Sequence, residues 1–123
     1  MVDDDPAIRK LLELRFQLDD FETLSTGEPE DAVRLAAEER PDALVLDVMM
    51  PGMDGYEVCR RLRTSGAQSQ PIVVMLSARD SAESMQTGLD AGADDYILKP
   101  PDLDELVERV QSRLRQRATG SAA

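Results

Sequence analysis

The sequence predicts an α/β fold in which helices cover both faces of a parallel β-sheet. Short apolar runs alternate with amphipathic stretches along the chain, and this alternation is typical of strand–helix–strand units with right-handed crossovers. The run ALVL at residues 43–46 is apolar at every position, as expected of a strand buried on both faces. The 123 residues suffice for one domain with a proper core.

Five helices are predicted from the helical spacing of apolar residues and from signals at the helix ends. They cover residues 6–17, 29–39, 55–64 and 81–91, and a last helix follows residue 102. Pro6 suits a first helical turn, Gly92 suits a C-terminal cap, and Asp102 can cap the last helix.

Five strands are predicted, at residues 1–2, 21–25, 43–47, 72–76 and 95–99. The first is unusually short, because only Met1 and Val2 precede a run of three acids, whereas strands usually have about five or six residues. A strand this short would leave unpaired backbone groups on its neighbours.

Charge and composition exclude several classes of function. The net charge of −11 argues against nucleic-acid binding by this domain itself, because phosphate backbones are bound by clustered Lys and Arg. The chain has no His, which excludes any mechanism that needs a His base, nucleophile or metal ligand within it. An acidic domain instead suits a cation or a basic partner surface.

The single cysteine and the hydropathy pattern indicate the compartment. Cys59 has no partner for a disulfide, fits a reducing compartment, and is interpreted as a buried helix residue. No apolar run approaches about 20 residues and no signal peptide is present. The expectation is therefore a cytoplasmic protein with no membrane association.

Polar residues follow the predicted strands where the strands end. They are Asp3, Asp4, Asp47, Ser77 and Lys99, and the carboxyl ends of parallel strands meet at one edge of a sheet. Clustered carboxylates suit Mg²⁺, and a carboxylate can attack a phosphoryl group while an ammonium and a hydroxyl stabilise its oxygens. Taken singly, each residue also has a purely structural interpretation. Asp47 could form a turn, the acids at residues 3–5 could favour a helix N-terminus, Ser77 could be a capping or turn hydroxyl, and Lys99 could be a solvated charge.

Taken together, these motifs resemble the receiver domain of two-component response regulators. The matching features are the acid pair at residues 3–4, the Asp in LVLDVMMPGMDG, the Ser-Ala after IVVML, and YILKP. The resemblance covers essentially the whole chain in order. The form GADDYILKP and the following helix are most similar to receivers of the winged-helix transcription-factor class.

The resemblance implies a flavodoxin-like, doubly wound, five-stranded parallel sheet of order 2-1-3-4-5 with five helices. The short first strand would then lie at the centre of the sheet. Residues 1–117 would form the receiver domain, and residues 118–123 a tail or the start of a linker.

The resemblance also implies the roles of the site residues. Asp47 would accept a phosphoryl group from the phosphohistidine of a sensor histidine kinase. The Mg²⁺ cofactor would bind Asp4, Asp47 and the backbone carbonyl of Met49, with Asp3 acting through a bound water or from outside the ligand sphere.

Other implied roles concern the phosphoryl group and the response to it. Ser77, the backbone of Ala78, and Lys99 would contact the phosphoryl oxygens, and Tyr96 would rotate inward with Ser77. The bond between Lys99 and Pro100 would be cis, a geometry that is favourable only before proline.

In the winged-helix class, phosphorylation promotes a homodimer through the fourth helix, fifth strand and last helix. Acids before the fifth strand pair with basic residues of the partner's last helix. The matching residues here are Asp94, Asp95, Glu105, Arg109 and Arg115, with Arg113 as an alternative partner of Asp94. The fourth helix offers no basic residue to Glu105, so one ion pair of this surface is expected to be missing.

Alternative functions remain beside this one. A haloacid-dehalogenase-type phosphatase also has an Asp after a buried strand but needs a second acid two residues on, where this chain has Met49. A phosphorylation-independent receiver typically lacks the acid pair, the Asp or the Lys. We expect a phosphoacceptor that assists its own phosphorylation and dephosphorylation but is not otherwise an enzyme. Its output is either transcription, through a following domain, or protein–protein contact as a stand-alone regulator.

Overall fold

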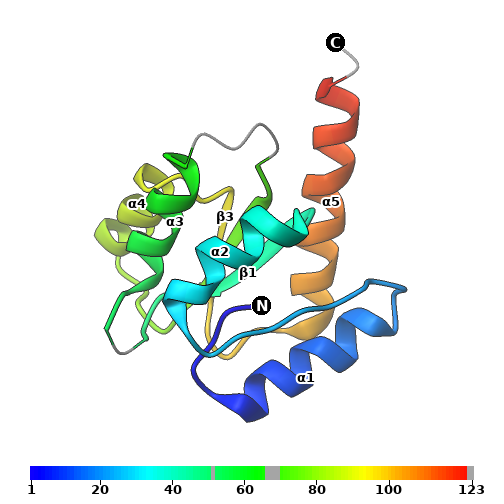
Figure 1. Ribbon diagram of the computed structural model, residues 1–123, viewed down its shortest axis with the longest axis horizontal. Coiled ribbons are helices and arrows are strands. Elements are labelled where there is room, and N and C mark those ends of the chain that lie inside the picture. Colours follow the sequence, from blue (N-terminus) through cyan, green and yellow to red (C-terminus); the bar gives the residue numbers. More distant parts are fainter. Residues whose placement is uncertain (51, 66–69, 122–123) are drawn as a thin grey trace.

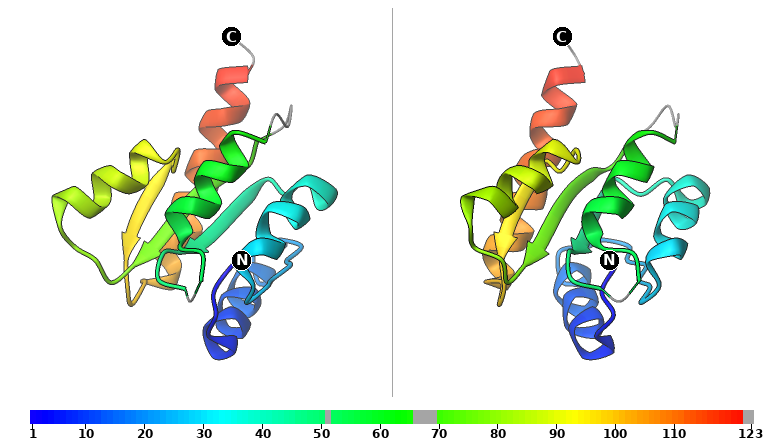
Figure 2. Two further views of the ribbon diagram at one scale, coloured as in Figure 1. Left: turned by 60° about the vertical axis from the view of Figure 1, so that its left-hand side comes forward. Right: turned by 90° about the vertical axis from the view of Figure 1, so that its left-hand side faces the viewer.

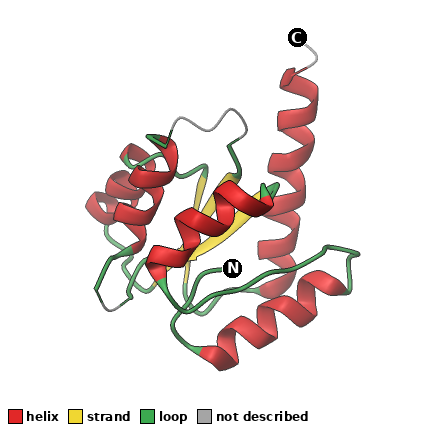
Figure 3. Cartoon of the chain, viewed as in Figure 1, coloured by secondary structure: helices red, strands yellow, loops and turns green. Residues whose placement is uncertain are grey.

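The computed structural model describes residues 1–50, 52–65 and 70–121, with side chains through Arg117. Five helices and three strands follow one another along this part of the chain (Figures 1 and 3). In order, they are α1 (Pro6–Gln17), α2 (Pro29–Glu39), β1 (Ala43–Asp47), α3 (Gly55–Arg63), β2 (Ile72–Ser77), α4 (Ala82–Asp90), β3 (Asp95–Leu98) and α5 (Leu103–Ser121). The five predicted helices are confirmed, with small shifts at their ends.

Helix ends follow the capping signals of the sequence. The Asp5 carboxylate accepts a hydrogen bond from the Ala7 amide at the start of α1. Asp54 accepts from the Glu57 amide at the start of α3, and Asp102 accepts from the Glu105 amide ahead of α5. Each carboxylate satisfies an amide that has no partner within the first helical turn.

The sheet is parallel and has the order β1-β2-β3. In its register, Asp47 lies opposite Leu76, and Leu76 lies opposite Ile97. The carboxyl ends of the three strands therefore meet at one edge of the sheet.

The prediction of five strands is wrong for the described residues, which form three. Val2 instead makes isolated parallel bridges to Thr26 on one side and to Leu46 on the other. Its amide donates to the Val45 carbonyl at 2.9 Å, and its carbonyl accepts from the Asp47 amide at 2.8 Å. The short N-terminal segment thus lies where the first strand was expected. It is too short to form a ladder or to give residues 21–25 a partner, so neither segment becomes a strand.

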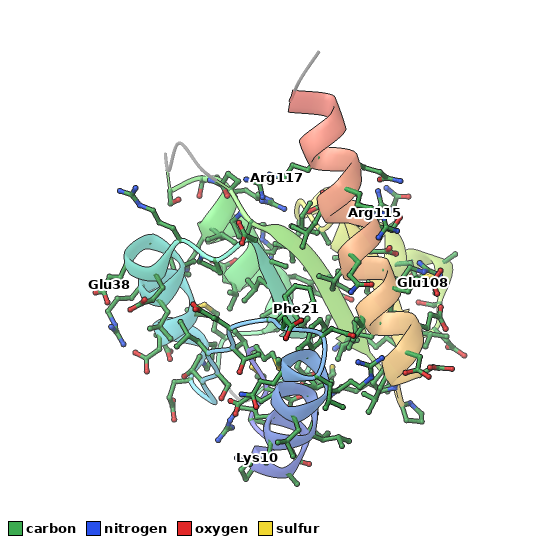
Figure 4. All side chains as sticks on the ribbon, turned by 90° about the vertical axis from the view of Figure 1, so that its right-hand side faces the viewer. Lys10, Phe21, Glu38, Glu108, Arg115 and Arg117 are labelled. Atoms are coloured by element: carbon green, nitrogen blue, oxygen red, sulfur yellow. The ribbon has the colours of Figure 1, made fainter. Side chains whose placement is uncertain are left out.

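A cavity of about 670 Å³ lies beside this N-terminal segment. It is bounded by residues 21–26 on one side and the start of β1 on the other, and Met1 and Val2 line it. Phe21 (Figure 4) lies at the border of the cavity. Its ring packs edge-on against that of Phe16, with the ring centroids 5.2 Å apart. The cavity thus lies next to the point where the pairing between the N-terminal segment and residues 21–26 ends.

The core has two halves, one on each face of the sheet (Figure 2). Leu46, Val73 and Met75 face α2 and α3, whereas the alternate residues Val45 and Val74 face α1 and α5. Successive side chains of a strand point to opposite faces, so the apolar runs of β1 and β2 supply both halves.

Arg63, at the end of α3, joins the amino-terminal ends of two strands. Its guanidinium donates to the carbonyls of Pro71 and Gly92, both at 2.9 Å, and pairs with the Asp94 carboxylate at 3.0 Å. Asp94 also accepts from the Val73 amide at 2.8 Å. Arg63 and Asp94 therefore link the two strands at this edge of the sheet, opposite the strand ends described above.

Helix α5 extends beyond the rest of the molecule (Figure 1), and Arg115 and Arg117 lie exposed on its second half (Figure 4). The helix continues through Ser121, so most of the predicted tail at residues 118–123 is helical. Residues 122–123 lie outside the described residues, and the domain boundary stays a prediction. No helix of the described residues is both long and apolar enough to cross a membrane.

Cys59 lies fully buried on α3. Burial raises the pKa of its thiol, and the nearby Arg63 guanidinium offsets this only in part. Because the thiolate is the reactive form, we expect Cys59 to react with a thiol reagent at least about a hundredfold more slowly in the native protein than in urea. A chromogenic disulfide reagent at pH 8 measures both rates, and equal rates would show that the side chain is accessible.

Candidate functional site

Three carboxylates gather at the carboxyl-terminal edge of the sheet. Oxygens of Asp3, Asp4 and Asp47 all lie within 4.8 Å of one another. Asp47 ends β1, and Asp3 follows Val2, which pairs with β1 on the other side. Asp3 and Asp47 are only 2% and 3% exposed, whereas Asp4 is exposed. Two negative charges are thus buried side by side, and a third lies at the surface.

Lys99 bridges the two buried carboxylates. Its Nζ lies 3.1 Å from Asp3 Oδ2 and 3.0 Å from Asp47 Oδ1. The residue follows β3, its amide donates to the Ser77 carbonyl at 2.9 Å, and its bond to Pro100 is cis, as the resemblance implies. One ammonium faces three carboxylates, so the site keeps an excess of negative charge.

The pKa values of Asp47 and Lys99 show the effect of burial. Burial raises the pKa of the Asp47 carboxyl; the hydrogen bond from Lys99 opposes this shift, and the negative charge of Asp3 adds to it. Burial acts to lower the pKa of the Lys99 ammonium, but the bonds to Asp47 and Asp3 outweigh it, so that pKa is raised. The ammonium is therefore held in its charged form.

The loop after β1 folds back over Asp47. The Met49 amide donates to Asp47 Oδ1 at 3.3 Å, and the Gly55 amide donates to the Val48 carbonyl at 2.9 Å. A Cβ at Gly55 would lie 2.5 Å from the Asp47 carbonyl oxygen and 2.8 Å from Val48 Cα. Only glycine permits this approach, which brings residue 49 next to the carboxylates.

Ser77 is the last residue of β2 and is fully buried. It lies opposite Leu98, at the same edge as the carboxylates. Its Oγ accepts a hydrogen bond from the Arg79 amide at 3.0 Å. Ala78, directly after it, is exposed. The structure thus holds the Ser77 hydroxyl in the turn that leaves the strand.

Tyr96 of β3 is half-buried and is linked to the same turn. Its hydroxyl donates to the Arg79 carbonyl at 3.2 Å and lies 3.3 Å from the hydroxyl of Tyr56, which itself donates to the Ser84 carbonyl at 3.2 Å. Burial raises the pKa of Tyr96, and the nearby Ser77 hydroxyl partly offsets this. Sequence reasoning missed Tyr56, because its partner Tyr96 lies 40 residues away along the chain.

Asp95, Glu105 and Arg109, which are predicted for a dimer surface, form ion pairs within the chain. Asp95 pairs with Arg109 at 2.9 Å and with Arg113 at 3.6 Å, and Arg109 also pairs with Glu105 at 3.1 Å. Asp94 binds elsewhere, to Arg63 and the Val73 amide. Arg115 is exposed on the far part of α5 (Figure 4).

Comparison with known proteins gives concordant matches. A family model described as the response regulator receiver domain matches residues 1–111. The chain is 47% identical over 122 residues to the response regulator MprA of Mycobacterium leprae (strain TN), covering 99% of this chain and 53% of that protein. It is 46% identical to MprA of Mycobacterium bovis (strain BCG / Pasteur 1173P2), covering 100% and 53%. The chain therefore spans about half of the length of these relatives.

Solved structures give the same result. The receiver domain of the Francisella response regulator 1452 matches with a TM-score of 0.87 and 33% identity, covering 94% of each chain. The BeF3-activated N-terminal receiver domain of Klebsiella pneumoniae RstA matches with a TM-score of 0.83 and 35% identity, covering 93% of this chain and 95% of that one. The flavodoxin-like receiver fold is confirmed, with the strand number corrected above. The chain belongs to the response regulator receiver domains.

Proposed function

We propose that Asp47 is the phosphoacceptor of this receiver domain. The observation that carries the proposal is the pairing of the buried Asp47 carboxylate with Lys99 at 3.0 Å, beside two further carboxylates. In the proposed step, an Asp47 oxygen forms a bond to phosphorus while the phosphorus–nitrogen bond of a kinase phosphohistidine breaks, and the imidazole leaves with its electron pair. The absence of His from the chain agrees with a donor on another protein.

The donor set of the site fits Mg²⁺. All three acids offer hard oxygen ligands, and one ammonium leaves their charge incompletely balanced. Asp4, Asp47 and the Met49 carbonyl would hold the ion, with Asp3 acting through a bound water. The bound ion would neutralise charge on the oxygens of the transferring phosphoryl group.

Three further residues would contact the oxygens of the phosphoryl group on Asp47. Lys99 already contacts Asp47 Oδ1 and would move to the phosphoryl oxygens. Ser77 would turn from the Arg79 amide to donate its hydroxyl proton, and the Ala78 amide would donate from the backbone. Tyr96 would follow Ser77, because both bond to the backbone of Arg79. The surface of α4, β3 and α5 would then change, as a shift between two packings biased by the added charge.

Phosphorylation by labelled acetyl phosphate tests the proposal. We expect Mg²⁺-dependent labelling of the wild type, loss of labelling with a chelator, and only background labelling of Asp47→Asn. Asp42→Asn is the matched control, since Asp42 is exposed at the opposite end of β1 and should label normally. Full labelling of Asp47→Asn would overturn the assignment.

The output is proposed from the relatives. Two of them are response regulators about twice as long as this chain, and another structure is described as an N-terminal receiver domain. We propose that this domain takes its phosphoryl group from a sensor histidine kinase and controls transcription through a following domain. A stand-alone regulator acting by protein–protein contact is the alternative, and the length of the gene distinguishes the two.

A phosphorylation-promoted homodimer is proposed to use the ionic surface of β3 and α5. Asp95, Glu105 and Arg109 would exchange partners within the chain for partners on a second copy. Asp94 would pair with Arg115 or Arg113 of that copy, for which it first has to leave Arg63 and the Val73 amide.

Gel filtration with and without beryllofluoride and Mg²⁺ tests the dimer. We expect a shift from monomer to dimer in the wild type and a weaker shift in Arg109→Ala. Arg34→Ala is the control, since Arg34 pairs only within α2 among the described contacts. A wild type that stays monomeric under conditions that give full labelling would exclude the dimer.

A further inference from the structure

We infer that Tyr56 positions Tyr96, and that this pair of tyrosines carries the state of Ser77 to helix α4. The inference rests on the proposed function, because it assumes that Ser77 moves toward a phosphoryl group on Asp47. Three hydroxyls and two backbone carbonyls make up the link, and they come from α3, β2, β3, α4 and the turn after β2.

Tyr56 is fixed by its burial and by two contacts. It is only 4% exposed, its hydroxyl reaches the Ser84 carbonyl on α4, and the Arg79 guanidinium carbon lies 6.0 Å above its ring. A buried phenol needs a hydrogen-bond partner for its hydroxyl. Tyr56 therefore presents its oxygen to Tyr96 at a defined position between α3 and α4.

Tyr96 is held against α4 by the lack of a side chain at Gly88. A Cβ at Gly88 would lie 2.9 Å from Tyr96 Cδ2 and 3.1 Å from the sulfur of Met75. The Tyr96 ring thus packs directly on the helix backbone, with its hydroxyl at the Tyr56 hydroxyl. A movement of Tyr96 has to involve α4, Tyr56 or both.

The number of protons makes this network sensitive to Ser77. The two tyrosine hydroxyls carry two protons, but three contacts link them to the Arg79 carbonyl, the Ser84 carbonyl and each other. At any moment, therefore, one of the three contacts lacks a proton. Ser77 bears on this network through Arg79, whose amide donates to the Ser77 oxygen and whose carbonyl accepts from the Tyr96 hydroxyl.

When Ser77 turns to the phosphoryl group, the Arg79 amide loses its acceptor, and the Arg79 carbonyl can move away from the Tyr96 hydroxyl. The Tyr96 proton can then turn from that carbonyl to the Tyr56 oxygen, so that Tyr96, Tyr56 and the Ser84 carbonyl of α4 form one chain of hydrogen bonds. Without the Tyr56 hydroxyl, this exchange has no route to the helix. Tyr56→Phe keeps the ring and its packing but removes the exchange, so phosphorylation should proceed while its effect on α4 is reduced.

Two measurements on the same samples test the inference. Phosphorylation by acetyl phosphate and Mg²⁺ gives the extent of labelling, and backbone amide NMR gives the chemical-shift change at Ser84 and Gly88 on activation with beryllofluoride. For Tyr56→Phe we expect normal labelling, an unfolding midpoint near that of the wild type, and shift changes at both amides reduced at least twofold. Tyr96→Phe should give the same reduction, and combining the two should add little.

Thr87→Val is the matched control, because Thr87 also loses a hydroxyl on α4 but bonds only to the Glu83 carbonyl of its own helix. Its shift changes should equal those of the wild type. Normal labelling of Tyr56→Phe with undiminished shift changes would overturn this inference and leave the proposed function intact. A wild type that takes no label would overturn the proposed function and, with it, this inference.

Discussion

Lys99→Met is expected to destabilise the metal-free protein by about 3 kcal/mol at neutral pH, since it leaves two buried carboxylates without their cation. Lys99 lies 3.1 Å from Asp3 and 3.0 Å from Asp47, and both acids are almost completely buried. Removing one member of a buried ionic cluster is costly because the remaining charges have neither water nor a partner. Added Mg²⁺ should recover part of the loss, because it supplies positive charge to the same oxygens.

The loss should depend on pH in a defined direction. Burial already raises the pKa of Asp47 above its ordinary value of 3.8, and removal of the Lys99 hydrogen bond would raise it further. A carboxyl with a raised native pKa binds more protons folded than unfolded, so stability falls as pH rises through that pKa. The difference between wild type and Lys99→Met should therefore shrink as the pH is lowered toward about 4.

Urea unfolding followed by circular dichroism at several pH values measures both effects. Lys10→Met is the matched control, since Lys10 is the other lysine of the chain and lies exposed on α1 (Figure 4). It removes the same charge with no buried partner, so its stability should stay within about 0.5 kcal/mol of the wild type. Equal stability of Lys99→Met and Lys10→Met would show that Lys99 does not compensate the buried acids.

Gly55→Ala is expected to cost about 3 kcal/mol of stability and to reduce labelling of Asp47. Its Cβ would contact the Asp47 carbonyl oxygen at 2.5 Å and Val48 Cα at 2.8 Å. Both are backbone atoms next to the predicted phosphoacceptor, so no side-chain rotation relieves the overlap. The loop has to move, and it carries the Met49 backbone with it.

Gly52→Ala measures the cost of an unfavourable backbone conformation without steric overlap. Gly52 has a φ of +86° but nothing within 4 Å of its Cβ position, so it should cost only about 1–2 kcal/mol. Urea midpoints and acetyl phosphate labelling of the two variants give the comparison. A larger cost for Gly52→Ala than for Gly55→Ala would mean that backbone strain, rather than the close approach, controls this loop.

Much of the fold could be predicted because its signals are local. Helical spacing and caps such as Asp102 lie within a few residues of the ends that they define. The strand-like alternation at residues 21–25 was misleading, because a strand also needs a partner. The N-terminal segment pairs only Val2, with Thr26 and Leu46.

The site was predictable in its position but not in every contact. Strand ends place Asp47, Ser77 and Lys99 at one edge by topology alone. The sequence could not show that Asp3, rather than Asp4, is the buried partner of Lys99, because successive side chains of an extended segment point in opposite directions. The contact between Tyr56 and Tyr96 spans 40 residues and has no local signal.

Arg63 has a consequence for how a displacement can travel through this domain. Its bonds to Pro71, Gly92 and Asp94 tie α3 to the amino-terminal ends of β2 and β3. The spacing of these strands is therefore fixed at the end far from the carboxylates. The displacement proposed above to start at Ser77 would then be confined to the turns at the opposite end and to α4, so that one surface of the domain would change while the sheet keeps its geometry.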